Sequence, residues 1–159
     1  FYFEKIKAKD FFEEYTAYVA DTLGEAGIEF MYNFECDEDR EINIDPAQFR
    51  RVLNNLIDNS RKYGAEDGTA KIMLSVRNGE NGHIEISIED NGQGVPADER
   101  DKIFETFYRG DKARTGHKNG SGLGLAITKQ ITDRHGASIR ADESELGGLK
   151  VIIDLPQAK

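Results

Sequence analysis

In GSGLGLAITKQI, residues 120–131, three glycines at alternate positions lead directly into an apolar segment with helical spacing. Glycine adopts backbone angles closed to other residues and lets a ligand approach the main chain. The first N–H groups of a helix point outward and favour an anion. This glycine stretch therefore predicts a phosphate-binding turn that opens a helix. The alternative is a flexible loop that happens to precede a helix.

Two familiar phosphate-binding motifs do not fit the chain. The dinucleotide fingerprint needs G-x-G-x-x-G directly after a buried strand, whereas the spacing here is G-x-G-x-G and the preceding DKARTGHKN is polar. The other motif, G-x-x-x-x-G-K-S/T, occurs nowhere in the sequence. The glycine stretch therefore belongs to another kind of site.

The composition indicates one domain with a single apolar core. The chain has 159 residues, of which 38% are hydrophobic, and it contains no apolar run long enough to cross a membrane. The net charge of -9 opposes non-specific binding to nucleic acid or to an anionic membrane, so the expected partner is a protein or a small molecule. The chain begins without Met and lacks the apolar core of a signal peptide, and we expect a fragment of a longer protein.

The hydrophobic pattern alternates between helical and strand periods along the chain. A period of about four predicts a helix over 10–26, with Asp10 and Glu13 as a capping box and Gly27 at its end. A period of two predicts strands over 28–34, 41–44, 72–76 and 84–88, and in the stretches ASIRAD and LKVIIDL near the end of the chain. The elements together predict an α/β (α+β) two-layer sandwich, in which a mixed, mainly antiparallel sheet is covered on one face by three helices.

A second helix is expected over 46–63, where Asp45 fits the N-cap. On this helix Asn55, Asn59 and Lys62 are four and three residues apart, so they share one face. Asparagine is a poor residue in mid-helix, which indicates a use beyond packing. Amide oxygens are hard neutral ligands for Mg²⁺, and a lysine one turn on can meet phosphates. The three residues are therefore candidates for a magnesium and phosphate site, and the alternative is a solvated polar face.

Two further segments carry candidate ligand-binding residues. In EDNGQGVP, Asp90 can accept a hydrogen bond from an amine such as that of adenine, and Gly92 and Gly94 leave room for a flat base. The alternative for this segment is an ordinary turn. Residues 108–119 carry Arg109 and three more basic residues beside the glycine stretch. They predict a mobile basic lid that closes on a polyphosphate, with a solvated loop as the alternative.

Four stretches in one order resemble the motifs of the catalytic ATP-binding domain of bacterial sensor histidine kinases. This family shares a superfamily with gyrase-type, heat-shock-chaperone and mismatch-repair ATPases. NNLIDNSRKYG (54–64) is similar to the family's N box and EDNGQGVP (89–96) to its first glycine box. IFETFYR (103–109) is similar to its F box and GSGLGLA (120–126) to its second glycine box. The resemblance implies the family's fold with a mobile ATP lid, and ATP with Mg²⁺ as the ligand.

The resemblance also implies a role for each matching residue. Asn59 would hold Mg²⁺ with help from Asn55, and Lys62 and Arg109 would contact the phosphates. The nucleoside side of the pocket would be formed by Tyr63, Asp90, Gly92 and Gly94, and the lid and triphosphate side by Phe104, Phe107, Gly120, Ser121, Gly122, Leu123, Gly124 and Leu125. No catalytic residue is clear in this chain, and the glycine stretch is identified as lid hinge and phosphate cradle.

The expected reaction is phosphotransfer to a histidine. In the related ATPases a glutamate that activates water occupies the position of Asn55, and an amide cannot serve as a general base at neutral pH. The family's acceptor is a histidine on a separate helical domain, and His83, His117 and His135 do not fit its pattern. We expect all three to be bystanders, with His135 capping a helix end. Two other functions stay open: a nucleotide-sensing adaptor and a conformational ATPase.

The resemblance further implies how the chain is placed in a longer protein. Residues 1–9 would be the remnant of a linker from upstream dimerisation and phosphoacceptor helices, and residues 10–157 would be the catalytic domain. The expected partners are those helices and, through the full-length protein, a response regulator, but no nucleic acid. The fragment itself would be monomeric. It would be cytoplasmic, in a parent protein that can be anchored in the cell membrane.

Overall fold

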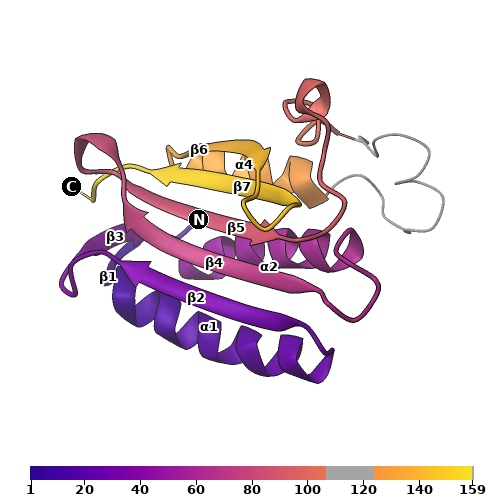
Figure 1. Cartoon of the computed structure of the whole chain (residues 1–159). Helices are drawn as coiled ribbons and strands as arrows, with labels where there is room; N and C mark the ends of the chain where they lie inside the picture. Colours follow the sequence, from indigo (N-terminus) through magenta and orange to yellow (C-terminus); the bar gives the residue numbers. More distant parts are fainter. Residues whose placement is uncertain (107–123, 159) are drawn as a thin grey trace.

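The structure is a computed structural model that describes residues 1–106 and 124–158. Within these ranges the main sheet has five strands in the order β2-β4-β5-β7-β6 (Figure 1). Their bounds are Glu29–Glu35 for β2, Lys71–Asn78 for β4, Ile84–Asp90 for β5, Ser138–Glu143 for β6 and Leu149–Leu155 for β7. Strand β2 runs parallel to β4, and the other neighbours pair antiparallel. The predicted mixed, mainly antiparallel sheet is confirmed.

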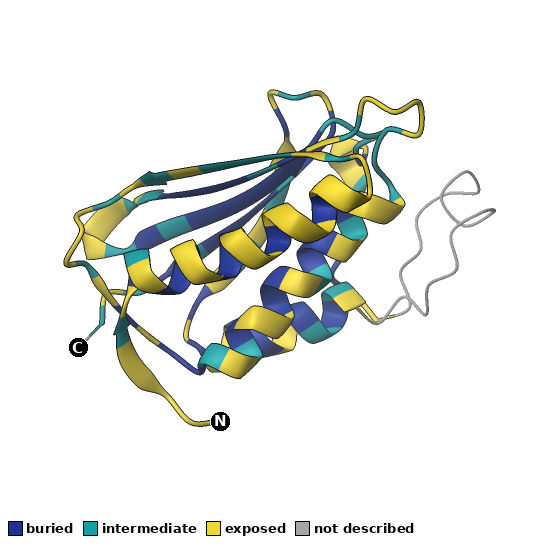
Figure 2. Ribbon diagram, turned by 90° about the horizontal axis from the view of Figure 1, so that it is seen from below, coloured by how far each residue is buried: buried dark blue, intermediate teal, exposed yellow. Residues whose placement is uncertain are grey.

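Three helices of the described chain lie on one face of this sheet, as Figures 1 and 2 show. They are α1 (Ala8–Glu25), α2 (Pro46–Lys62) and α4 (Gly124–Arg134), and two short 3-10 helices cover Glu80–Gly82 and Ala97–Glu99. The alternating apolar residues of the central strands are buried under the helices: Ile72, Leu74, Val76, Ile84, Ile86, Ile88, Val151 and Ile153. The two-layer sandwich is therefore confirmed. No helix in the described ranges combines the length and the apolar character needed to cross a membrane.

The outer face of the sheet is only partly exposed. Ser75 and Ser87 are directly paired across β4 and β5, and Ser87 is paired with Ile152 on β7. All three residues are buried. Besides the face under the helices, the centre of the sheet therefore buries part of its other face.

The start of α1 differs from the prediction. The helix begins at Ala8 after Lys7, which makes no side-chain capping bond, so the expected capping box of Asp10 and Glu13 is wrong. The reason is tertiary, because the preceding residues form strand β1 (Glu4–Lys7), which pairs antiparallel with β3 (Glu41–Ile44) in a separate two-stranded sheet. Residues expected to be a linker thus pair with the domain. The predicted end is confirmed, since Gly27 has φ of +75°.

Helix α2 follows its sequence signals closely. The Asp45 side chain accepts a hydrogen bond from the Gln48 N–H at 3.1 Å, and Pro46 occupies the first helical position. Its apolar stripe is buried, with Phe49, Val52, Leu53, Leu56 and Ile57 facing the core. The Phe49 ring contacts Phe11 of α1 at 5.9 Å and His135, just after α4, at 5.4 Å between centroids. Helix α2 therefore has α1 on one side and α4 on the other.

Candidate functional site

The predicted metal residues lie on the side of α2 that meets α4. Asn55 is half-buried, and its side-chain Nδ2 donates to the Gly124 carbonyl oxygen and to Thr128 Oγ1, each at 3.3 Å. Asn55 therefore contacts the first turn of the helix that follows the glycine stretch. The N box and the end of the second glycine box are therefore in contact in the fold.

Asn59 and Lys62 continue the same face of α2 toward its end. Asn59 is half-buried, and its side chain makes no hydrogen bond to residues 1–106 or 124–158. The Lys62 side chain is exposed, and Tyr63 is the half-buried C-cap residue. Because Asn59 is half-buried and has no hydrogen-bond partner among the described residues, its side chain is open to a ligand or to water, and its metal-binding role stays a prediction.

The turn after β5 holds Asp90 in a fixed orientation. Asp90 is only 3% exposed, and its Oδ1 accepts hydrogen bonds from the backbone N–H groups of Gly92 at 2.9 Å and Leu149 at 3.2 Å. The Gly148 N–H donates to the Asp90 carbonyl at 3.0 Å. A Cβ on Gly148 would lie 2.2 Å from Asp90 Oδ1, so glycine is required there. In the sequence, Gly148 belongs to no motif, and the pair Gly147–Gly148 is the one local signal that marks it.

The two glycines of the first glycine box allow a backbone conformation and a close approach that other residues would prevent. A Cβ on Gly92 would lie 2.1 Å from the Tyr63 carbonyl oxygen, so only glycine lets the turn approach the end of α2 this closely. The Gln93 N–H donates to that oxygen at 3.2 Å, and Gly94 has φ of +71°. The segment is thus a turn, as the alternative interpretation states. The predicted pocket for the adenine base is compatible with this turn and stays a prediction.

Several predicted residues lie outside the described residues. These are Phe107, Arg109, Gly120, Ser121, Gly122 and Leu123, together with His117. Of the rest of the lid and the glycine stretch, Phe104 is buried in the core, Gly124 is exposed and Leu125 is half-buried. The first aromatic residue of the F box is therefore part of the core, and its role in anchoring a lid stays a prediction.

The two described histidines make protein contacts. His135 is buried, its Nδ1 lies 2.8 Å from the Ile131 carbonyl oxygen, and its Nε2 accepts from the Asp45 N–H at 3.1 Å. A ring that donates from Nδ1 and accepts at Nε2 is neutral, and burial lowers the pKa of His135. His83 Nδ1 lies 2.7 Å from Asp154 Oδ1. The helix-end role expected for His135 is confirmed.

The donor set at the α2–α4 side fits magnesium. In the described ranges no group of three or more His, Cys, Asp or Glu residues can hold a metal ion. The candidate ligands remain the predicted ones, the amide oxygens of Asn55 and Asn59 on α2. Because the Asn55 N–H groups are taken up by α4, its oxygen is the end left for a hard cation. A site with so few protein ligands suits a magnesium ion, which usually keeps several of its waters and is also coordinated by the phosphates of a nucleotide.

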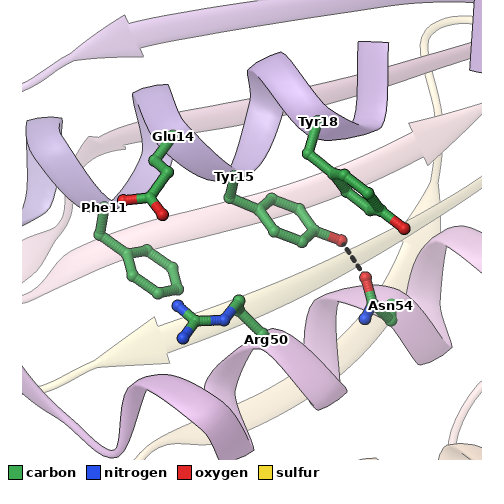
Figure 3. Close-up of a pocket in the computed structure, with 6 residues that line it drawn as sticks. All are labelled: Phe11, Glu14, Tyr15, Tyr18, Arg50 and Asn54. Atoms are coloured by element: carbon green, nitrogen blue, oxygen red, sulfur yellow. Dashed lines mark hydrogen bonds between the residues drawn. The ribbon is translucent and has the colours of Figure 1, made fainter. Parts of the chain in front are cut away.

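A groove lies on the other side of α2, between α1 and α2 (Figure 3). It has a volume of about 350 Å³ and is lined by Phe11, Glu14, Tyr15, Tyr18, Arg50 and Asn54. None of these residues belongs to the four motifs except Asn54, whose oxygen accepts a hydrogen bond from the Tyr15 hydroxyl at 2.8 Å. The groove is thus separate from the predicted nucleotide residues.

The two-layer sandwich and the polar residues between α2, α4 and the turn after β5 define the class of ATP-binding α/β domains. Residues 44–159 match the family described as histidine kinase-, DNA gyrase B- and HSP90-like ATPases, and the chain belongs to this family. It is 40% identical over 132 residues to the sensor histidine kinase WalK of Bacillus subtilis, which covers 83% of this chain and 21% of WalK. Its relatives place it with the sensor histidine kinases.

Solved structures agree with this placement. The catalytic domain of the histidine kinase ThkA superposes with a TM-score of 0.81 at 23% identity, over 100% of both chains. The ATP-binding domain of PrrB from Mycobacterium tuberculosis superposes with a TM-score of 0.73 at 26% identity, over 99% of this chain and 98% of PrrB. The fold is therefore that of a histidine kinase ATPase domain, and the chain spans about a fifth of the length of WalK.

Proposed function

We propose that this chain binds ATP with magnesium and donates the γ-phosphoryl group to a histidine on a separate helical domain of a two-component sensor kinase. The observation that carries the proposal is the pair of amides on α2. Asn59 has no partner in the described chain, and Asn55 is held against α4 with its oxygen turned away from that helix. The family and the relatives named sensor kinases support the same function.

The residues of the chain bind and orient the donor. Asn59 and Asn55 would hold magnesium, which neutralises charge on the phosphates when it is bound. Lys62 and Arg109 would contact the phosphates, and the fixed Asp90 carboxylate would select adenine. In the transfer the acceptor imidazole nitrogen forms a bond to the γ-phosphorus. The bond to the bridging oxygen breaks, ADP leaves with that electron pair, and the imidazole proton passes to a base on the acceptor domain.

Water is a poor acceptor at this site. Asn55 occupies the position at which related ATPases carry a glutamate, and its amide is not basic. The expected partners are upstream dimerisation and phosphoacceptor helices and, through the full-length protein, a response regulator. The parent would place this domain in the cytoplasm and can carry a membrane anchor elsewhere. The domain alone is expected to be monomeric and not to bind nucleic acid.

Calorimetric titration with a non-hydrolysable ATP analogue, with and without Mg²⁺, tests the binding half of the proposal. We expect micromolar to sub-millimolar affinity, roughly -5 to -8 kcal/mol. A mixture of the chain, radiolabelled ATP and a helical phosphoacceptor domain of a related kinase should then label the acceptor histidine. No label from a folded, ATP-bound chain would contradict phosphotransfer. Steady phosphate release by the chain alone would favour the conformational ATPase instead.

A further inference from the structure

The start of α4 contains a closed hydrogen-bond network with a residue outside the four motifs. Thr128 is 0% exposed, and its Oγ1 donates to the Gly124 carbonyl oxygen at 2.9 Å. Asn55 Nδ2 lies 3.3 Å from each of these two oxygens. A threonine in this position therefore meets both a candidate metal ligand and the residue that ends the glycine stretch.

The network admits one orientation of the Asn55 amide. The Gly124 carbonyl has no proton, and the Thr128 hydroxyl donates its only proton in the hydrogen bond to that carbonyl. Both oxygens can therefore act only as acceptors toward Asn55. Only the NH₂ end of the amide can donate to them. The opposite orientation would place the Asn55 oxygen against two acceptors and lose both hydrogen bonds. The oxygen of Asn55 is thereby turned away from α4.

We infer that Thr128 is a positioning residue for magnesium, because its hydroxyl fixes the Asn55 amide with the oxygen free to coordinate. The inference rests on the proposed function and deepens it. Without the hydroxyl, the Gly124 carbonyl alone would orient the amide, and the amide would turn more easily.

The test compares Thr128→Val, which keeps the shape but lacks the hydroxyl, with Thr128→Ser, which keeps the hydroxyl but lacks the methyl group. The affinity of a non-hydrolysable ATP analogue is measured by calorimetry with and without Mg²⁺. We expect Thr128→Val to reduce the Mg²⁺-dependent gain in affinity about tenfold, as is typical when an outer partner of a metal ligand is lost. Its affinity without Mg²⁺ should stay at the wild-type value. Thr128→Ser should restore the Mg²⁺-dependent gain.

A second measurement separates positioning from packing. In the wild-type chain, the Asn55 side-chain amide protons should exchange slowly with solvent, and Thr128→Val should speed the exchange. Fast exchange in the wild type would overturn the inference even if Thr128→Val fails to fold. An unchanged Mg²⁺-dependent gain in Thr128→Val, or a loss in Thr128→Ser equal to that in Thr128→Val, would also overturn it.

The titrations distinguish failure of the Thr128 role from failure of the proposed function. If the wild-type chain shows no Mg²⁺-dependent gain, both fail. If the wild type shows the gain and Thr128→Val shows the same gain, only the role of Thr128 fails. A loss in Thr128→Val with recovery in Thr128→Ser supports both.

Discussion

Two neighbouring asparagines on α2 face opposite sides of the helical layer. Asn54 faces α1, where its Oδ1 accepts a hydrogen bond from the Tyr15 hydroxyl at 2.8 Å (Figure 3). Asn55 faces α4, where its Nδ2 donates to Gly124 and Thr128. The same residue type thus uses its acceptor end on one side of α2 and its donor end on the other.

The difference shows which amide can serve a cation. The Asn54 side-chain oxygen accepts a hydrogen bond from the Tyr15 hydroxyl, so this side chain joins α1 to α2. The Asn55 side-chain nitrogen donates hydrogen bonds to α4, so its oxygen stays available one helical turn from Asn59. A coordinating role follows from the partner of the amide rather than from the residue type. We therefore expect substitutions on the α4 side to affect nucleotide binding and substitutions on the α1 side to affect stability.

The largest effect is expected from Asn59→Ala, set against Asn54→Ala as the matched control. Removal of the proposed metal ligand should abolish the Mg²⁺-dependent part of nucleotide affinity, a loss of about a hundredfold or more. Asn54→Ala should leave that affinity within about twofold, because its oxygen already serves Tyr15. Calorimetry with a non-hydrolysable ATP analogue measures both. Full Mg·ATP affinity in Asn59→Ala would contradict the metal assignment.

Asp90→Asn should weaken adenine selectivity without removing the turn. An amide oxygen can still accept from Gly92, but the charge that would face the adenine amine is lost. We expect the preference for an adenine over a guanine nucleotide to fall about tenfold, the value of one charged hydrogen bond. Competition of ATP and GTP analogues measures the preference, with exposed Asp142→Asn as the control. An equal fall in the control would show that the effect is non-specific.

Tyr15→Phe tests the hydrogen bond that joins α1 to Asn54 of α2. It removes the hydroxyl that donates to Asn54, and we expect a loss of about 1 kcal/mol in the free energy of unfolding. Denaturant unfolding of Tyr15→Phe, Asn54→Ala and the double variant gives the coupling between the two side chains. Nucleotide affinity should not change. A marked loss of affinity would mean that the α1 side also shapes the nucleotide site.

The smallest expected effect is a pH dependence from His135, which joins the end of α4 to the start of α2. Burial lowers its pKa, opposed by the hydrogen bond to Ile131 and by the Asp45 carboxylate. The unfolded chain therefore binds the proton more tightly, and stability falls as the pH drops below about 6.5, by at most about 1.4 kcal/mol per pH unit. His135→Gln should flatten the slope of unfolding free energy between about pH 6.5 and 5. An unchanged slope would assign the dependence to other groups.

The sequence predicted most of the fold because its signals were local. The N-cap of α2, its buried stripe, the hairpin of β4 and β5 and the helix after the glycine stretch all follow from spacing within a few residues. The misses came from pairing over long distances. Residues 4–7 looked like a linker and form β1 because β3 lies beside them, and this pairing moves the start of α1.

For the candidate site, the placement of residues on one helix was predicted, and their roles in binding stay predictions. The spacing of Asn55, Asn59 and Lys62 put them on one face, and the structure agrees. Thr128 and Gly148 were missed because neither belongs to a motif. Each matters through a contact with a residue far away in the sequence, Thr128 with Asn55 and Gly148 with Asp90.

By itself, the sequence determined the helical and strand periods, the N-cap of α2, the order of the four motifs and hence the family, because these depend on residues close together along the chain. The tertiary structure alone decided which end of each amide is used, which glycines must lack a Cβ, and which buried hydroxyl fixes a ligand. These depend on the atom that another element places opposite each side chain. Asn54 and Asn55 are the same residue type and differ in the end of the amide that each uses, because α1 presents a donor and α4 presents acceptors.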